Sequence, residues 1–213
     1  MSLTIGPVHE DFVAEVYDVD LSKPVSPDVL DEIKTAFWKY SVLVFPEQTL
    51  DQEQHVSFAR NFGPMDMTVL KSAVADQKLR VREDIADVSN LGPNEEILEE
   101  SNRLRRLQLG NRLWHTDSSF KYVPALASLL YAREIPPTGG QTAFADLRAA
   151  YDALPEAMQL RLEGLVAEHS LVYSRERMGY TDWEDHERKA VDAVPQVMVR
   201  TVPQTGRKNL YVA

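Results

Sequence analysis

A histidine and an aspartate lie two positions apart, at His115 and Asp117, within the stretch NRLWHTDSSF of residues 111–120. On an extended segment, side chains two positions apart leave the same face of the backbone. One neutral imidazole and one carboxylate on one face supply two corners of a 2-His-1-carboxylate triad, which holds Fe(II) and leaves coordination positions free for oxygen and a co-substrate. The spacing alone also fits a surface pair that is hydrogen-bonded locally, so both interpretations stay open at this point.

The other possible metal ligands of the chain are histidines and carboxylates. The chain contains no cysteine, so its 213 residues hold no disulfide, thiolate zinc site or cysteine nucleophile, and any metal must bind to His, Asp or Glu. Lone histidines without partners are commonly solvated, and we interpret His9, His55 and His186 in this way. His169 lies in a strand-like segment, where it would either line a pocket or be hydrogen-bonded in the core.

Composition and charge indicate an ordinary globular protein. Hydrophobic residues make up 44% of the chain and charged residues 26%, as in typical folded domains. The formal net charge of −10 argues against non-specific binding to nucleic acid, because such binding depends on Lys and Arg. No apolar run approaches the roughly 18–20 residues that span a bilayer, and the first residues lack the pattern of a signal peptide. We therefore expect a cytoplasmic protein that binds neither nucleic acid nor membranes.

Local signals predict the helices that must position the pair. Ser26-Pro27-Asp28 supplies an N-cap, a proline at the first helical position and an early acid. Apolar residues follow at helical spacing, so residues 27–40 are expected to form an amphipathic helix. Asp51 and Gln54 resemble a capping box that opens a second helix, which Gly63-Pro64 closes.

Short apolar and β-branched runs predict the strands. We expect strands at residues 41–45, 81–88, 125–133, 171–173, 197–202 and 209–213. A further helix is expected at 146–154, and the densely charged residues 95–106 indicate a solvated surface loop. Strands that follow helices without regular βαβ alternation favour a β-rich barrel or sandwich with flanking helices.

Several motifs, in order, resemble the TauD/TfdA family of Fe(II)/2-oxoglutarate-dependent dioxygenases. That family places Trp-His-X-Asp before a strand and then Thr-Gly-Gly-X-Thr, and residues 114–117 and 138–142 match both motifs with a similar spacing. The likeness continues through residues 144–151, 168–174 and 206–211 and covers nearly the whole chain. Several motifs in the right order are far more specific than any one of them.

The resemblance implies a single domain across residues 1–213. Its fold would be mainly β with flanking helices (α+β), a double-stranded β-helix or jelly roll. The family's second iron-binding histidine and the arginine that pairs with 2-oxoglutarate come later, on the closing strands of the barrel. We therefore expect that the C-terminal portion of the domain is absent from this chain, which ends within a predicted strand at Ala213.

The resemblance also assigns roles to residues. His115 and Asp117 would be the catalytic iron ligands, and Thr142 would bind a carboxylate of 2-oxoglutarate. Asn111 matches a position that contacts substrate, and Lys71 is a candidate for the substrate's acidic group. Fe(II) is the implied metal, with 2-oxoglutarate as co-substrate and O2 as oxidant.

The implied reaction is hydroxylation of a small anionic organic substrate, with release of succinate and CO2. Residues 145–151 and 169–174 look closer to the phenoxyacetate branch of the family than to the taurine branch. Hydroxylation next to an ether oxygen would give a hemiacetal that collapses to a phenol and glyoxylate. The alternatives are a taurine-like sulfonate as substrate, and a non-catalytic, truncated barrel that binds partners or sequesters a metal. Family members commonly form dimers or tetramers, so a homo-oligomer is expected.

Overall fold

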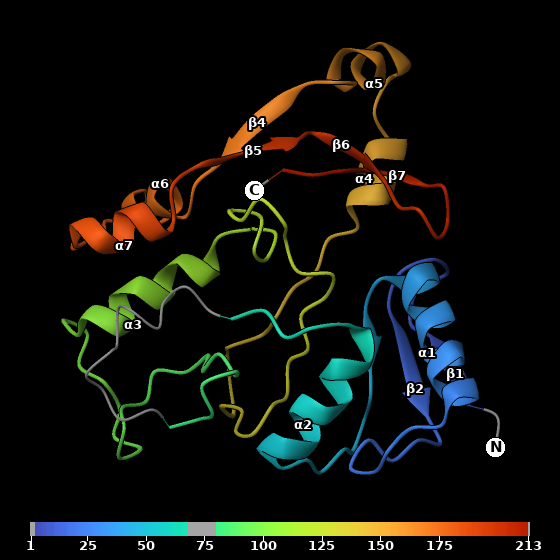
Figure 1. Ribbon diagram of the computed structural model, residues 1–213, viewed down its shortest axis with the longest axis horizontal. Coiled ribbons are helices and arrows are strands. Elements are labelled where there is room, and N and C mark those ends of the chain that lie inside the picture. Colours follow the sequence, from blue (N-terminus) through green and yellow to red (C-terminus); the bar gives the residue numbers. More distant parts are fainter. Residues whose placement is uncertain (1–2, 68–79, 213) are drawn as a thin grey trace. The chain divides into compact units, whose positions relative to one another are not determined.

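The computed structural model describes residues 3–67 and 80–212, where helices and short strands alternate with irregular segments (Figure 1). The chain divides into two compact units. Unit 1 comprises Met1–Pro64, Leu129–Arg161 and Val199–Leu210, and unit 2 comprises Met65–Ser128, Leu162–Met198 and Tyr211–Ala213. Among the described helices, none is both long and apolar enough to cross a membrane.

Unit 1 carries a three-stranded sheet, a β-hairpin and most of the longer helices. Its elements are β1 (Thr4–Pro7), β2 (Ala14–Tyr17), α1 (Pro27–Tyr40), β3 (Leu43–Val44), α2 (Gln52–Ala59), the 3-10 turn η1 (Arg60–Phe62), α4 (Leu147–Asp152), α5 (Glu156–Leu162), β6 (Val199–Thr201) and β7 (Lys208–Leu210). β2 pairs antiparallel with β1 and parallel with β3. β6 and β7 form an antiparallel hairpin, and α4 packs against β7.

The helices of unit 1 begin where local chemistry predicts. α1 spans residues 27–40 with Pro27 in its first turn, and Ser26 has the extended backbone of an N-cap although its side chain makes no capping hydrogen bond. The capping box of Asp51 and Gln54 at the start of α2 is confirmed. The apolar side chains of both helices are buried in two small clusters, formed by Ala14, Ala36 and Tyr40, and by Leu21, Ile33 and Phe58.

Unit 2 contains shorter helices and one pair of strands. Its elements are α3 (Arg103–Gln108), the 3-10 turn η3 (Leu109–Arg112), β4 (Val166–His169), α6 (Leu171–Glu176), α7 (Asp185–Ala190) and β5 (Val194–Val197). β4 and β5 are antiparallel, with His169 opposite Val194. Arg103 of α3 forms an ion pair with the buried Glu187 of α7, and the fully buried Tyr180 packs beside this pair. These contacts fix the helix that leads into η3.

Several predicted strands are wrong. Residues 171–173 begin α6 instead, because the Ser170 hydroxyl accepts a hydrogen bond from the backbone N–H of Tyr173 and so caps a helix. Residues 81–88 and 125–133 form no strand, and residues 197–202 divide between β5 and β6, which pair with different strands. A strand needs a partner that supplies backbone hydrogen bonds, and the described residues form sheets of three, two and two strands with no closed barrel.

Candidate active site

The His115–Asp117 pair lies in the irregular segment that follows η3. His115 Nε2 is 3.1 Å from Asp117 Oδ1, so the two side chains face one another. His115 Nδ1 lies 2.7 Å from the carbonyl oxygen of Leu113, and Asp117 Oδ2 accepts a hydrogen bond of 2.6 Å from the Ser128 hydroxyl. Each side chain is therefore held through the atom that does not face its partner.

Each side chain of the pair shifts the pKa of the other. The hydrogen bond with Asp117 raises the pKa of His115 above its usual value, against the opposing effect of burial. The same bond lowers the pKa of Asp117; burial opposes this effect and the hydrogen bond from Ser128 supports it. The pair thus favours a positive charge between imidazole and carboxylate, which either a proton or a metal cation can supply.

The donor atoms fit a ferrous ion. Both ring nitrogens of His115 face acceptors, so the contacts suit a ring protonated on both nitrogens. A cation that replaced the proton on Nε2 would leave Nδ1 donating to the carbonyl oxygen of Leu113. One imidazole nitrogen and one carboxylate oxygen are two of the three donors of a facial Fe(II) site. Within residues 3–67 and 80–212, no third metal-binding side chain completes a cluster with them.

The loop that carries Asp117 is pinned by polar contacts within unit 2. Ser118 has a left-handed backbone with φ 52°, and its hydroxyl accepts a hydrogen bond of 2.7 Å from the backbone N–H of Ala125. The buried Gln196 of β5 donates to the carbonyl oxygens of Ser119 and Lys121, at 3.0 and 2.7 Å. The strand β5 therefore positions the segment that follows Asp117.

Asn111 is held by an arginine from another helix. Arg175 of α6 donates a hydrogen bond of 2.9 Å to Asn111 Oδ1, which leaves the Asn111 amide N–H groups free to donate elsewhere. The Arg175 side chain packs directly over Gly110, where a Cβ atom would approach its Cδ to 2.2 Å. Its positive charge is also felt by His115, whose pKa it lowers slightly. Asn111 and the His115–Asp117 pair thus belong to one connected part of unit 2.

The other predicted site residues are not brought into this arrangement. Thr142 lies exposed in an irregular segment of unit 1, so its role at the pair stays a prediction. Lys71 lies outside the described residues. His169 is buried and stacks on Tyr211, with ring centroids 5.4 Å apart, so it is packed in the interior.

Ser128 and Arg175, which bind Asp117 and Asn111, were not predicted from the sequence. Ser128 fell inside a predicted strand, and Arg175 belongs to a segment whose start was predicted to be extended. Their partners are 11 and 64 residues away along the chain. No local pattern signals such contacts.

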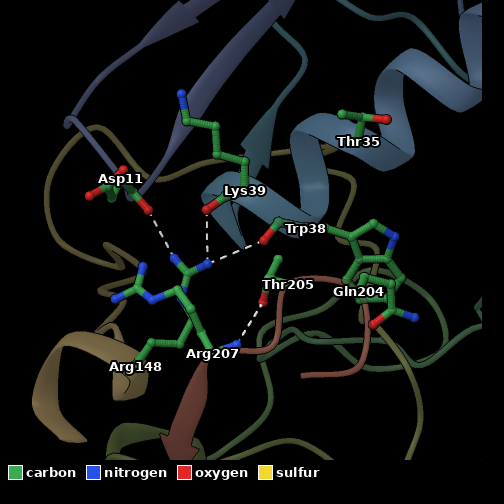
Figure 2. A pocket seen from close by; sticks show the side chains of 8 residues that line it. All are labelled: Asp11, Thr35, Trp38, Lys39, Arg148, Gln204, Thr205 and Arg207. Carbon is green, nitrogen blue, oxygen red and sulfur yellow. Dashed lines mark hydrogen bonds between the residues drawn. The ribbon is translucent and has the colours of Figure 1, made fainter. Parts of the chain in front are cut away.

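A pocket of about 410 Å³ in unit 1 does not compete as a reaction site. Figure 2 shows the Arg148 guanidinium directed at the backbone carbonyl groups of Asp11, Trp38 and Lys39. Its remaining N–H groups bind Asp146, so all five of its donors are taken. Arg148 is therefore a structural tie between α4 and the end of α1.

A family model described as taurine catabolism dioxygenase TauD, TfdA family, matches residues 4–213. The chain belongs to the TauD/TfdA family. It is 40% identical over 212 residues to the alpha-ketoglutarate-dependent 2,4-dichlorophenoxyacetate dioxygenase of Cupriavidus pinatubonensis, covering 100% of this chain and 74% of that relative. It is 36% identical over 222 residues to the (S)-phenoxypropionate/alpha-ketoglutarate-dioxygenase of Sphingobium herbicidovorans, covering 98% of this chain and 69% of that relative.

Solved structures agree with this membership. The crystal structure of AAD-2 in complex with Mn(II) and N-oxalylglycine superposes with a TM-score of 0.94 at 44% identity, covering 100% of this chain and 74% of that one. The TauD/TfdA dioxygenase is therefore of the non-haem Fe(II)/2-oxoglutarate type. Its structural neighbours have the jelly-roll fold that the sequence predicted. The absence of a C-terminal portion stays a prediction.

Proposed function

We propose that this TauD/TfdA dioxygenase hydroxylates a small aryloxyalkanoate anion, such as a phenoxyacetate, at the carbon next to the ether oxygen. The observation that carries the proposal is the His115–Asp117 pair, whose donor atoms face each other at 3.1 Å. Relatives named for 2,4-dichlorophenoxyacetate and (S)-phenoxypropionate, at 40% and 36% identity over nearly the whole chain, support the aryloxyalkanoate class.

In this proposal each site residue has one role. His115 and Asp117 hold Fe(II), and Thr142 binds a carboxylate of 2-oxoglutarate through its hydroxyl group. Asn111 donates its amide N–H groups to the substrate, because its oxygen is already bound by Arg175. Lys71 supplies a positive charge for the acidic group of the substrate.

The chemistry that a bound Fe(II) supplies, with 2-oxoglutarate and O2, is insertion of one oxygen atom into a C–H bond while the second ends in succinate and CO2 leaves. The chain's contribution is geometric and electrostatic. His115 Nδ1 lies against the carbonyl oxygen of Leu113 and Asp117 Oδ2 is bound by Ser128, so His115 Nε2 and Asp117 Oδ1 would hold the metal. An oxygen atom inserted beside an ether gives a hemiacetal, which breaks to a phenol and glyoxylate without further help.

A substrate panel scored by succinate release tests the proposal. We expect O2-dependent succinate formation with 2,4-dichlorophenoxyacetate or a phenoxypropionate, together with the matching phenol, and only background release with taurine. Turnover of taurine or alkylsulfonates without aryloxy acids would replace the substrate class. Tight metal binding without any 2-oxoglutarate turnover would support a metal-sequestering or other non-catalytic role instead.

The domain organisation, the oligomeric state and the cellular location of the protein are also proposed. We propose that residues 1–213 fold as one domain, that the protein forms a homodimer or homotetramer, and that it works in the cytoplasm on a small anionic substrate. Light scattering coupled to size-exclusion chromatography tests the oligomeric state, and a monomeric mass at micromolar concentration would contradict a homodimer or homotetramer.

A further inference from the structure

The two oxygen atoms of Asp117 have different partners. Oδ1 is 3.1 Å from His115 Nε2, whereas Oδ2 is 2.6 Å from the Ser128 hydroxyl oxygen. The second distance is typical of a hydrogen bond from a hydroxyl group to a carboxylate, which is among the stronger hydrogen bonds in proteins. The carboxylate is therefore fixed in rotation, with Oδ1 turned toward the histidine.

Ser128 reaches Asp117 through a loop that is closed twice. The Ser118 hydroxyl accepts a hydrogen bond of 2.7 Å from the Ala125 N–H, and the Ser128 hydroxyl then binds the residue just before Ser118. Both contacts lie within unit 2. The second contact is thus supported by the first rather than being an isolated surface interaction.

This arrangement affects how a cation can bind. A carboxylate can hold a metal through one oxygen or through both. A hydroxyl proton directed at Oδ2 repels a cation from that oxygen, so Asp117 offers only Oδ1. In a site that must keep coordination positions open for a co-substrate and oxygen, a carboxylate that bound through both oxygens would fill one position too many.

We propose that Ser128 is a positioning residue that holds Asp117 as a one-oxygen metal ligand. The inference rests on the proposed metal site at His115 and Asp117 and adds a residue that acts on the metal through Asp117 alone. Outer groups that hydrogen-bond to metal ligands change metal affinity by about 10–100-fold when they are removed. The same order of effect is expected here.

Mn(II) binding tests the proposal without relying on turnover. The loss of the free Mn(II) signal in electron paramagnetic resonance gives a dissociation constant for the wild type, Ser128→Ala and Ser128→Thr. We expect Ser128→Ala to bind Mn(II) about 10–100-fold more weakly, and Ser128→Thr, which keeps the hydroxyl, to bind within about threefold of the wild type by the same reasoning.

The chain offers a matched control. The Ser22 hydroxyl donates to an oxygen of Asp20 in unit 1, so Ser22→Ala removes the same kind of hydrogen bond away from the pair. Ser22→Ala should bind Mn(II) as the wild type does. Wild-type affinity in a folded Ser128→Ala variant would overturn the role of Ser128 and leave the metal site standing. If the wild type binds no Mn(II), or His115→Ala binds it unchanged, the proposed metal site itself fails and the role of Ser128 fails with it.

Discussion

At the scale of single residues, the His115–Asp117 pair is held through its outer atoms, while its inner atoms face one another at 3.1 Å. The side chains are 38% and 61% exposed, so their packing contributes little to the free energy of unfolding. Their replacement should therefore remove chemistry while the fold remains.

We expect His115→Ala and Asp117→Ala each to reduce 2-oxoglutarate-dependent succinate release to background, because each change removes one of the two proposed metal donors. The free energy of unfolding should change by no more than about 1 kcal/mol, as for other exposed substitutions. Succinate assays and urea denaturation measure the two effects. Near-normal turnover in either variant would show that the pair is not the metal site.

A second histidine–carboxylate pair provides the control. His186 and Glu184 are also two residues apart, 3.2 Å between Nδ1 and Oε2, and both side chains are largely exposed. His186→Ala should retain wild-type turnover. The contrast separates a metal site from a surface histidine–carboxylate pair with the same two-residue spacing.

At the scale of elements, Arg148 ties α4 to the rest of unit 1 through backbone carbonyl groups, and Asp146 at the start of the helix neutralises its charge. The side chains of Arg148 and Asp146 are 5% and 10% exposed, and Asp146 also accepts the backbone N–H of Arg148 at the start of the helix. Burial alone would raise the pKa of Asp146, but the hydrogen bonds and charge of Arg148 hold it below its usual value. The folded chain therefore favours the ionised carboxylate.

Asp146→Asn should lower the free energy of unfolding by about 3 kcal/mol at neutral pH, because it leaves a buried guanidinium without its counter-charge. The pKa of Asp146 is lower in the folded than in the unfolded state, so its contribution is fully present above the usual carboxyl pKa and is lost as pH falls through the folded pKa. Urea denaturation between pH 3 and 7, about the range set by that linkage, measures both effects.

The exposed pair of Asp20 and Lys23 is the control for this experiment. Asp20→Asn should change the unfolding midpoint little, because solvent weakens exposed ion pairs. A loss of stability from Asp146→Asn that stayed constant down to pH 3 would contradict the linkage, since the two proteins should converge once the carboxyl group is protonated.

Gly110 allows η3 and α6 to approach each other. In Gly110→Ala the new Cβ would lie 2.2 Å from Arg175 Cδ, so the guanidinium must move and its hydrogen bond to Asn111 is lost. We expect little loss of stability, because the contact is with the outer part of a flexible side chain, and a KM for the aryloxy acid that rises more than kcat falls. Gly6→Ala, whose Cβ would meet Tyr17 at an ordinary 3.9 Å, should change neither constant.

At this scale, the elements that could be predicted from the sequence are those that depend on residues close together in the chain. The helices at 27–40 and after Asp51 were predictable because their starts depend on residues three or four positions apart. The predicted strands at 125–133 and 171–173 were wrong because a strand depends on a distant partner, whereas Ser170 caps a helix locally. The spacing of His115 and Asp117 indicated their proximity, but the contacts of Ser128 and Arg175 cross loops and elements that no local pattern encodes.

At the scale of the whole molecule, metal binding and the Asp146→Asn substitution act on different units. His115 and Asp117 belong to unit 2, and Asp146 and Arg148 belong to unit 1. A metal that binds only the folded state raises stability by about 2.7 kcal/mol at one hundred times its dissociation constant. For a protein of this size that corresponds to an increase of about 5–10 °C in Tm.

If residues 1–213 form one cooperative domain, saturating Mn(II) should raise, and Asp146→Asn should lower, the Tm of the same single calorimetric transition. The two shifts should add, because the sites share no residue, and His115→Ala should abolish only the Mn(II) shift. Two transitions, of which Mn(II) moves one and Asp146→Asn the other, would contradict the single-domain proposal and assign each transition to its unit. A Mn(II) shift that persists in His115→Ala would instead locate the metal away from the pair.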